Sequence, residues 1–299
     1  MRGRISTDKI SRVSSTDTSN TQPGLDCTTQ SPTTARVWGA LGVYVLSTLA
    51  ASVVLLAVQP HSGIDPAALS LVQFAPTLGV LATWLTFRKT VTGLLPAAVP
   101  SRRVGASVVA VVTACVLFWL LITMAAVVSG TALVGPAAVG GLPFAVFLLL
   151  QFLGAGGEEI GWRGLMQPIL ESRMTRFAAV SATGVTWALW HVQAFAAGLV
   201  IAVCFFVSTM AFAIVLGYLS NGSFHQRVLI ASIGHWLINI AGYLLAGDNI
   251  LDRPQIVFIA IAAVLIAVGS MTVRVLQRSK QHRPGLDHEQ STRAVNPPR

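Results

Sequence analysis

The stretch LVIAVCFFVSTMAFAIVLGYL, residues 199–219, contains no charged side chain and is long enough to cross a bilayer as one helix. Similar apolar segments lie on both sides of it, at about 37–58, 66–87, 104–128, 142–170, 177–197, 228–246 and 255–273. Most of them approach the ~20 residues that span the hydrocarbon core. The sequence therefore predicts an all-α membrane protein with about eight transmembrane helices.

Composition supports a membrane protein and argues against a soluble or nucleic-acid-binding one. Of the 299 residues, 54% are hydrophobic and only 10% are charged, whereas a soluble domain carries roughly a quarter charged residues. Eleven of the 20 Lys and Arg lie in the two ends, residues 1–36 and 274–299. This distribution is typical of anchoring beside a membrane and excludes a continuous basic groove for nucleic acid.

The chain divides into a polar tail predicted to be disordered (1–36), a membrane domain (37–273) and a basic C-terminal tail (274–299). Lys or Arg residues occur in loops 88–103, 171–176 and 220–227, whereas loops 59–65 and 129–141 have none. The positive-inside rule then predicts that both termini are cytoplasmic. Proline placement predicts helix starts at Pro66, Pro143 and Pro254, and a kink at Pro76.

Ionisable residues inside spans are costly, so they are the first candidates for function. Residues 154–164 read Gly-Ala-Gly-Gly-Glu-Glu-Ile-Gly-Trp-Arg-Gly and contain Glu158, Glu159 and Arg163. The segment 177–197 contains His191, and the segment 228–246 contains His235 and Asn239. Each of these features alone is typical of helix packing. Together they are expensive to keep in a membrane for packing only, which favours a functional site.

Helical spacing assigns different partners to the two adjacent carboxylates. Glu159 and Arg163 are four residues apart and can pair on one helix face. Glu158 lies about 100° around the helix from Glu159, so it points elsewhere and is the less neutralised carboxylate. It is therefore the better candidate for a general base.

His235 and Asn239 also share a helix face, since they too are four residues apart. Two histidines, one free carboxylate and an amide could converge on a polar intramembrane cavity that activates a water molecule. A metal is compatible with the same residues, with Glu158, His191 and His235 as zinc ligands, and so is a metal-free activated water.

These residues resemble the motifs of the CPBP family (CAAX processing and bacteriocin processing, also called Abi). That family carries Glu-Glu-x-x-x-Arg, then an aromatic-x-x-x-His, then His-x-x-x-Asn or Asp. Here Glu158, Glu159 and Arg163 match the first motif, and His235 and Asn239 match the third. The second is matched by Trp187 and His191, with Trp where Phe is commonest. The resemblance covers about residues 142–246. One departure is Gln193, where many bacterial members have proline.

The resemblance implies an eight-helix intramembrane metalloendopeptidase with a cavity open to the cytoplasm. It implies that Glu158 and His191 activate the water, that His235 and Asn239 stabilise the oxyanion, and that Glu159 and Arg163 support them. Expected substrates are prenylated C-terminal CAAX tails, peptides or membrane-protein segments. The first motif has a form common in bacteria, which points to a bacterial plasma membrane. The placement of the basic residues predicts no nucleic-acid partner.

Two other functions remain open from the sequence. The first is a non-catalytic member of the same fold that confers bacteriocin immunity by binding a toxin or its receptor. The second is a metal or ion transporter, although the inverted repeats typical of transporters are not found in the sequence. Helix lengths also leave one structural question open, since Glu158 is predicted nearer the cytoplasmic face than His191. Either the helix of His191 begins before residue 177 or the helix of Glu158 is broken at Gly156–Gly157.

Overall fold

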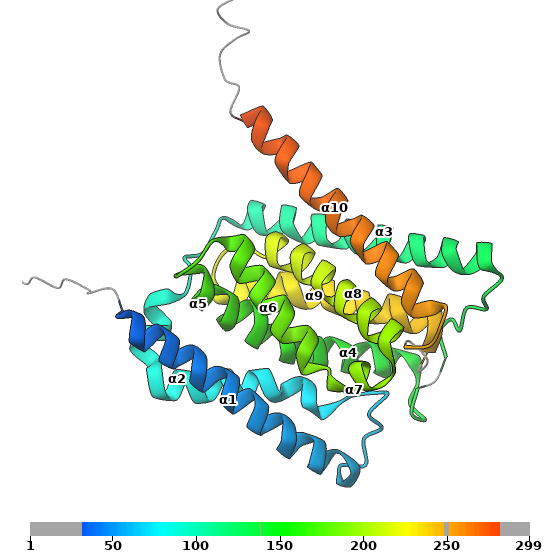
Figure 1. The fold of residues 1–299 in the computed structure, drawn as a ribbon, viewed down its shortest axis with the longest axis horizontal. Coiled ribbons are helices and arrows are strands. Elements are labelled where there is room, and N and C mark those ends of the chain that lie inside the picture. Colours follow the sequence, from blue (N-terminus) through cyan, green and yellow to red (C-terminus); the bar gives the residue numbers. More distant parts are fainter. Residues whose placement is uncertain (1–31, 138, 248–250, 282–299) are drawn as a thin grey trace, which may run out of the picture. The chain divides into compact units, whose positions relative to one another are not determined.

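The structure is a computed structural model that describes residues 32–137, 139–247 and 251–281. In these ranges the chain is helical, and its extended pairing is limited to an isolated bridge between residues 139 and 142. The α-helices are α1 (Thr34–Val58), α2 (Ala75–Leu94), α3 (Ser101–Ser129), α4 (Phe144–Glu159), α5 (Gln167–Glu171), α6 (Arg176–Trp190), α7 (Val192–Ala196), α8 (Leu199–Leu219), α9 (Phe224–Ala246) and α10 (Gln255–Gln281) (Figure 1). The 3-10 turns η1 (Gln59–His61) and η2 (Leu71–Phe74) precede α2, and the π-helix η3 (Ile160–Met166) joins α4 to α5. The predicted all-α fold is confirmed.

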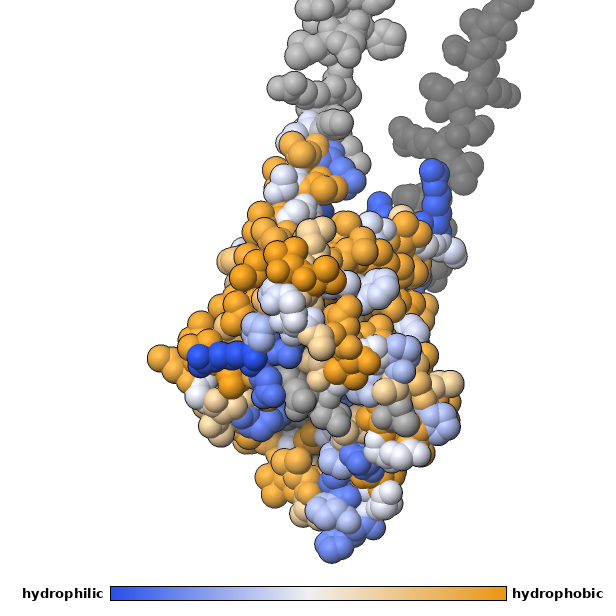
Figure 2. All heavy atoms as spheres, turned by 90° about the vertical axis from the view of Figure 1, so that its right-hand side faces the viewer, coloured by the Kyte–Doolittle hydropathy of each residue, from blue (hydrophilic) through white to orange (hydrophobic). Residues whose placement is uncertain are grey.

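Six helical stretches of the described residues are long and apolar enough to cross a membrane. They are Thr34–His61, Ser101–Ser129, Phe144–Glu171, Leu199–Leu219, Phe224–Ala246 and Gln255–Gln277. The two other predicted segments contain α2 and α6, so each of the eight is helical, but a count of eight spans is not confirmed. Exposed large apolar side chains lie along α1, α3 and α10, as a lipid-facing surface requires. The face shown in Figure 2 has apolar side chains over much of its upper part and polar ones gathered in its lower part. The protein is an integral membrane protein.

Several predicted boundaries are wrong by a few residues. Pro66 lies in a turn before α2, and Pro76 lies in the first turn of α2, where its missing N–H costs nothing and no kink results. The interruption of α2 falls instead at Phe87, which has non-helical backbone angles. Helix α1 already begins at Thr34, and α10 continues to Gln281, beyond the predicted boundary at 273. Residues 1–31 and 282–299 of the predicted tails lie outside the described residues.

Glycines allow the helices around α4 to approach closely. An added Cβ on Gly157 would lie 2.9 Å from the carbonyl oxygen of Gln73 and 2.8 Å from the ring of Phe74. The same atom on Gly154 would collide with the Gln73 side chain. Such close packing by small residues is common between membrane helices, because without a hydrophobic driving force they associate largely through tight contact. It brings η2 against the turn of α4 that carries the two glutamates.

The predicted basic loops lie together at one end of the helices. The side chain of Gln226 bonds both the backbone N–H and the carbonyl of Val99, at 2.9 and 2.8 Å, and so joins the link 95–100 to the start of α9. Arg176, at the start of α6, donates to Asn221 at 2.9 Å. We call this group of links (95–100, 172–175 and 220–223) the basic end.

The C-terminal part of α10 belongs to the same end, because Arg274 donates to the carbonyl of Tyr218 at the end of α8. At the other end, the N–H of Gly135 donates to the carbonyl of Leu244 at 3.0 Å. The loops that lack Lys and Arg are therefore separated from the basic ones along the helices. The structure supports the predicted grouping of loops.

Candidate active site

The last turn of α4 places both glutamates in the interior, where Glu158 is 2% exposed and Glu159 is fully buried. Helix α4 is not broken at Gly156–Gly157, and α6 begins at Arg176, one residue before the predicted start. The chain passes from Glu159 directly into the π-helix η3. Such wider turns shift the following side chains around the helix axis and occur frequently at functional sites.

Glu159 forms the charged pair that the sequence predicts. Its Oε1 atom lies 2.7 Å from Nη1 of Arg163 and 2.9 Å from Nδ1 of His235. The guanidinium of Arg163 also lies over the ring of Trp187, 4.4 Å from its centroid. One carboxylate thus holds a cation from its own helix and a histidine from α9. This geometry fits the supporting role that we predicted for Glu159 and Arg163.

Glu158 points to a different side and meets neutral donors. The indole N–H of Trp187 donates to its Oε2 atom at 2.8 Å, and that of Trp162 is 3.4 Å from the same atom. The amide of Gln73, from η2, donates to Oε1 at 3.2 Å. Among the described residues, none of its hydrogen-bond partners is a cation. The structure therefore agrees with the prediction that Arg163 neutralises only one of the two carboxylates.

His191 lies where the helix of the second motif ends. Its backbone leaves the helical region (φ −86°, ψ 62°) between α6 and α7, and its ring is partly exposed. The Nδ1 atom is 2.9 Å from the carbonyl oxygen of Trp187. Because a carbonyl can only accept, Nδ1 carries the proton in this contact, and Nε2 is left as the basic nitrogen.

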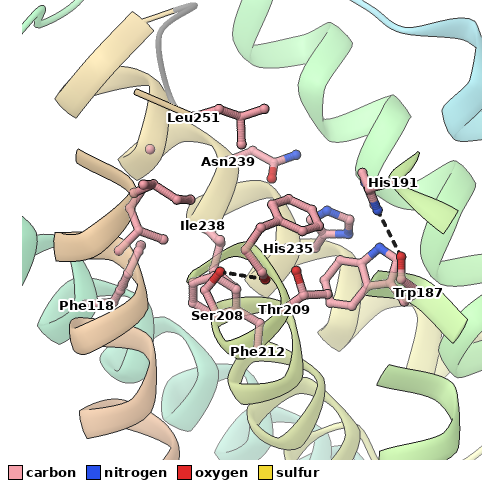
Figure 3. A pocket seen from close by; sticks show the side chains of 14 residues that line it. Phe118, Trp187, His191, Ser208, Thr209, Phe212, His235, Ile238, Asn239 and Leu251 are labelled. Carbon is pink, nitrogen blue, oxygen red and sulfur yellow. Dashed lines mark hydrogen bonds between the residues drawn. The ribbon is translucent and has the colours of Figure 1, made fainter. Parts of the chain in front are cut away.

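His191, His235 and Asn239 line one cavity together with Trp187 (Figure 3). The cavity has a volume of about 120 Å³, which is enough for several water molecules. The ring of Trp187 lies 5.0 Å from that of His235 and 6.4 Å from that of His191. The amide of Asn239 is positioned by Gln151, at 3.3 Å. Three of the four predicted catalytic residues therefore lie around this one cavity.

Glu158 is the exception, because it does not line this cavity. The indole of Trp187 binds the carboxylate with its N–H and presents its ring to the histidines, so it stands between them. Among the described residues, no group of three His, Cys, Asp or Glu side chains could hold a metal ion. The predicted zinc ligands Glu158, His191 and His235 are thus not gathered around one point in this arrangement.

Sequence reasoning gave no role to three side chains that position the site. Gln73 and Trp162 hold Glu158, and Gln151 holds Asn239. Trp162 could have been found, since it lies four residues after Glu158 on the same helix face. The two glutamines are amides inside apolar segments, which is a signal that the rule for intramembrane ionisable residues overlooks.

The cavity lies in the half of the bundle away from the basic end. Its lining runs from His235, in the middle of α9, through Gly242 towards the end of that helix, and includes Leu251, which precedes α10, and Ile256 in the first turn of α10. The charge pattern predicts a cytoplasmic basic end, whereas the resemblance implies a cytoplasmic cavity. These two expectations place the cavity on opposite sides of the membrane.

Comparison with known proteins matches the part of the chain that builds this site. Residues 140–241 match the family described as type II CAAX prenyl endopeptidase Rce1-like. The CAAX prenyl protease 2 of Methanococcus maripaludis is 29% identical over 136 residues, which are 41% of this chain and 50% of that protein. The chain thus spans half the length of the curated relative that it matches. All three motifs lie inside the matched region, and there the chain is similar to the type II CAAX prenyl endopeptidases, as the resemblance to the CPBP, or Abi, family led us to expect.

Proposed function

We propose that the chain is an intramembrane endopeptidase of the CAAX-processing type, which hydrolyses a peptide bond with a water activated by Glu158 and His191. The observation that carries the proposal is the different environment of the two adjacent carboxylates. Glu159 holds Arg163 and His235, whereas Glu158 is buried among neutral donors. A buried carboxylate without a cation partner is suited to take a proton from water.

The two histidines would have different roles in the reaction. The basic Nε2 atom of His191 would accept a proton or hold the water, because Nδ1 donates to a backbone carbonyl. His235 would donate from Nε2 to the oxyanion, with Glu159 balancing the positive charge on its ring through Nδ1. Asn239 lies on the same cavity wall and would supply a second donor.

The proposal requires the side chain of Trp187 to move. Its indole separates Glu158 from the cavity, so water or substrate must displace the ring before Glu158 and His191 can share a water molecule. Trp187 is therefore a positioning residue in this account. Hydrogen bonds of catalytic groups often tighten or change only in the complex with substrate, which fits such a movement.

The substrate we propose is a peptide or membrane-protein segment, with a prenylated C-terminal tail as the first candidate. The name of the related protein, a CAAX prenyl protease, supports this choice. The site lies roughly 20 Å along α6 from the basic end, by helix rise per residue. A substrate that comes from the basic end must therefore enter the membrane interior, as a lipidated tail can.

A cleavage assay in liposomes tests the proposal with prenylated and unprenylated peptides. Glu158→Gln should insert normally and lower cleavage by at least ~10²–10⁴-fold, the usual contribution of a positioned acid–base group. His225→Ala is the control, because this exposed histidine lies at the start of α9 and does not line the cavity. Wild-type protein that cleaves nothing, together with a Glu158→Gln variant that protects cells against a bacteriocin equally well, would favour the immunity function. Altered ion flux without proteolysis would favour the transporter.

Zinc dependence is part of the same proposal as an untested preference, since the resemblance to the CPBP family implies a metalloendopeptidase. The residues in this arrangement do not gather a three-ligand site, and the steps above need none. Elemental analysis of active protein decides the matter. Full activity in protein that contains no metal would remove zinc from the account and leave the activated water.

A further inference from the structure

A long groove lies between α3 and α10, on residues that the proposed active site does not use. It has a volume of about 860 Å³. Its walls are mainly apolar side chains, from Ala110 to Leu121 on α3 and from Leu265 to Val273 on α10. Many of these are exposed, so the groove faces the lipid rather than the interior of the bundle. Figure 1 shows α10 crossing α3 and extending beyond it.

Two cations line the part of this groove that is nearest the basic end of the bundle. Arg103, in the first turn of α3, and Arg274, near the end of α10, both line it, and Gln277 lies beside them. No carboxylate is among the lining residues. Arg274 is held in place by the carbonyl of Tyr218 and by the ring of the same residue, 5.4 Å from the guanidinium.

Arg103 has an exposed side chain, and within the described part of the chain its guanidinium has no hydrogen bond or ion pair. Its neighbour Arg102 is also exposed but does not line the groove. An unpaired guanidinium at the mouth of an apolar groove fits a phosphate, which it can bind through two hydrogen bonds.

A second groove beside α10 provides a contrast. It has a volume of about 420 Å³ and runs over Ile214, Ala267 and Met271, and its lining contains no charged residue. Ordinary contact with acyl chains therefore explains the second groove. The groove between α3 and α10 has cations at one end, so it fits a ligand that is apolar along its length and anionic at one end.

We propose that the groove between α3 and α10 binds one anionic phospholipid, with its phosphate at Arg103 and Arg274 and an acyl chain along the apolar walls. The distance from Arg103 to Leu121 is roughly 27 Å along the helix. This exceeds the ~15 Å of hydrocarbon in one leaflet, so an acyl chain fits within it. The headgroup then lies at the basic end, which the positive-inside rule predicts to be cytoplasmic, and the cytoplasmic leaflet is the one rich in anionic lipid. The proposal does not depend on the proposed peptidase activity.

Native mass spectrometry of the full chain, released from vesicles of equal phosphatidylglycerol and phosphatidylcholine, tests the site. The wild type should retain phosphatidylglycerol preferentially. Arg103→Gln should lower that preference about fivefold, the contribution of one cation beside an anionic surface. Arg102→Gln is the matched control and should leave it unchanged. Gly269→Leu should lower retention of the lipid, because Gly269 lines the groove and a side chain there meets nothing within 4 Å.

Three results would each overturn the proposal. The first is equal retention of both lipids by the wild type. The second is an equal loss in Arg102→Gln and Arg103→Gln, which would mean that general surface charge attracts the lipid. The third is undiminished retention in Gly269→Leu, which would place the lipid elsewhere. Since Arg102 and Arg103 are exposed and outside the packed core, their substitution should leave the fold intact.

Discussion

Trp187 connects the groups that the proposed reaction needs. Its indole N–H binds Glu158, its carbonyl accepts from His191, and its ring lies against His235 and under Arg163. One side chain thus fixes the base, and its backbone fixes the tautomer of the neighbouring histidine. At the residue scale, the proposed reaction makes this tryptophan the residue that controls whether Glu158 reaches the cavity.

Replacing Trp187 by phenylalanine tests that role. Trp187→Phe keeps an aromatic ring against His235 but removes the N–H that binds Glu158. We expect folded protein and a maximal cleavage rate lowered by roughly 10-fold, because Glu158 loses a donor that orients it. The maximal rate and the KM of cleavage in liposomes are the measurement. An unaltered maximal rate would show that the indole does not position Glu158.

Arg163 should contribute to the stability of the folded protein as well as to cleavage. Removing it takes the permanent cation away from a buried site that holds two carboxylates, which typically costs ~3–5 kcal/mol. Arg163→Ala should therefore lower both the yield of folded protein and its melting temperature, along with activity. Normal yield and melting temperature with lost cleavage would instead assign Arg163 a direct part in the reaction.

Residue spacing predicted the pairs but not the partners across helices. The i,i+4 rule was sufficient for Glu159 with Arg163, because both lie on one helix. It could not show that Glu159 also holds His235, or that Trp187 separates Glu158 from the cavity. Those contacts depend on how α4, α6 and α9 pack, which no local spacing contains. These contacts explain why Glu158, a predicted catalytic residue, does not line the cavity.

At the element scale, the turn of α4 before the glutamates depends on its glycines. Gly157 faces η2, where the carbonyl of Gln73 leaves no space for a Cβ, whereas a Cβ on Gly156 would meet only Ser232 Oγ, at 3.7 Å. The adjacent glycines therefore have different structural roles. Only one of them is required for η2 to reach Glu158.

Alanine substitution separates these two glycines. Gly157→Ala should destabilise the protein by ~1–3 kcal/mol, the usual effect of overpacking, and should displace Gln73 from Glu158. Gly156→Ala should be neutral or slightly stabilising, because alanine is the better helix former. Thermal melting in detergent compares them. Equal melting temperatures would contradict the close contact between η2 and α4.

Helix positions were predicted well, whereas helix ends and irregular turns were not. Apolar length placed a helix in each predicted segment, since bilayer thickness constrains it. The start of α2 was misplaced because Pro66 and Pro76 satisfy the same N-terminal preference, and the helix begins at the second of them. The π-helix after Glu159 has no signature in the sequence, because it depends on packing around residues 160–166.

At the scale of the whole molecule, the charge pattern predicts the side on which the cavity lies. Both tails and the basic end are predicted to be cytoplasmic, which would direct the cavity towards the opposite side. Single cysteines at Ala98 and Ala132, both exposed, report the two ends in a variant without the native cysteines. Outside labelling of Ala132→Cys alone is expected. Outside labelling of Ala98→Cys would reverse the orientation and give the cavity the cytoplasmic side that the resemblance implies.

The central claim is that Glu158 and His191 act together on one water molecule. Cleavage by Glu158→Gln, by His191→Ala and by the double variant, in liposomes under single-turnover conditions, tests it most directly. Each single change should lower the rate by at least ~10²-fold, and the double variant should be little slower than either, because residues that act as a unit are not additive. Losses that multiply in the double variant, or a Glu158→Gln variant that cleaves at the wild-type rate, would contradict the claim.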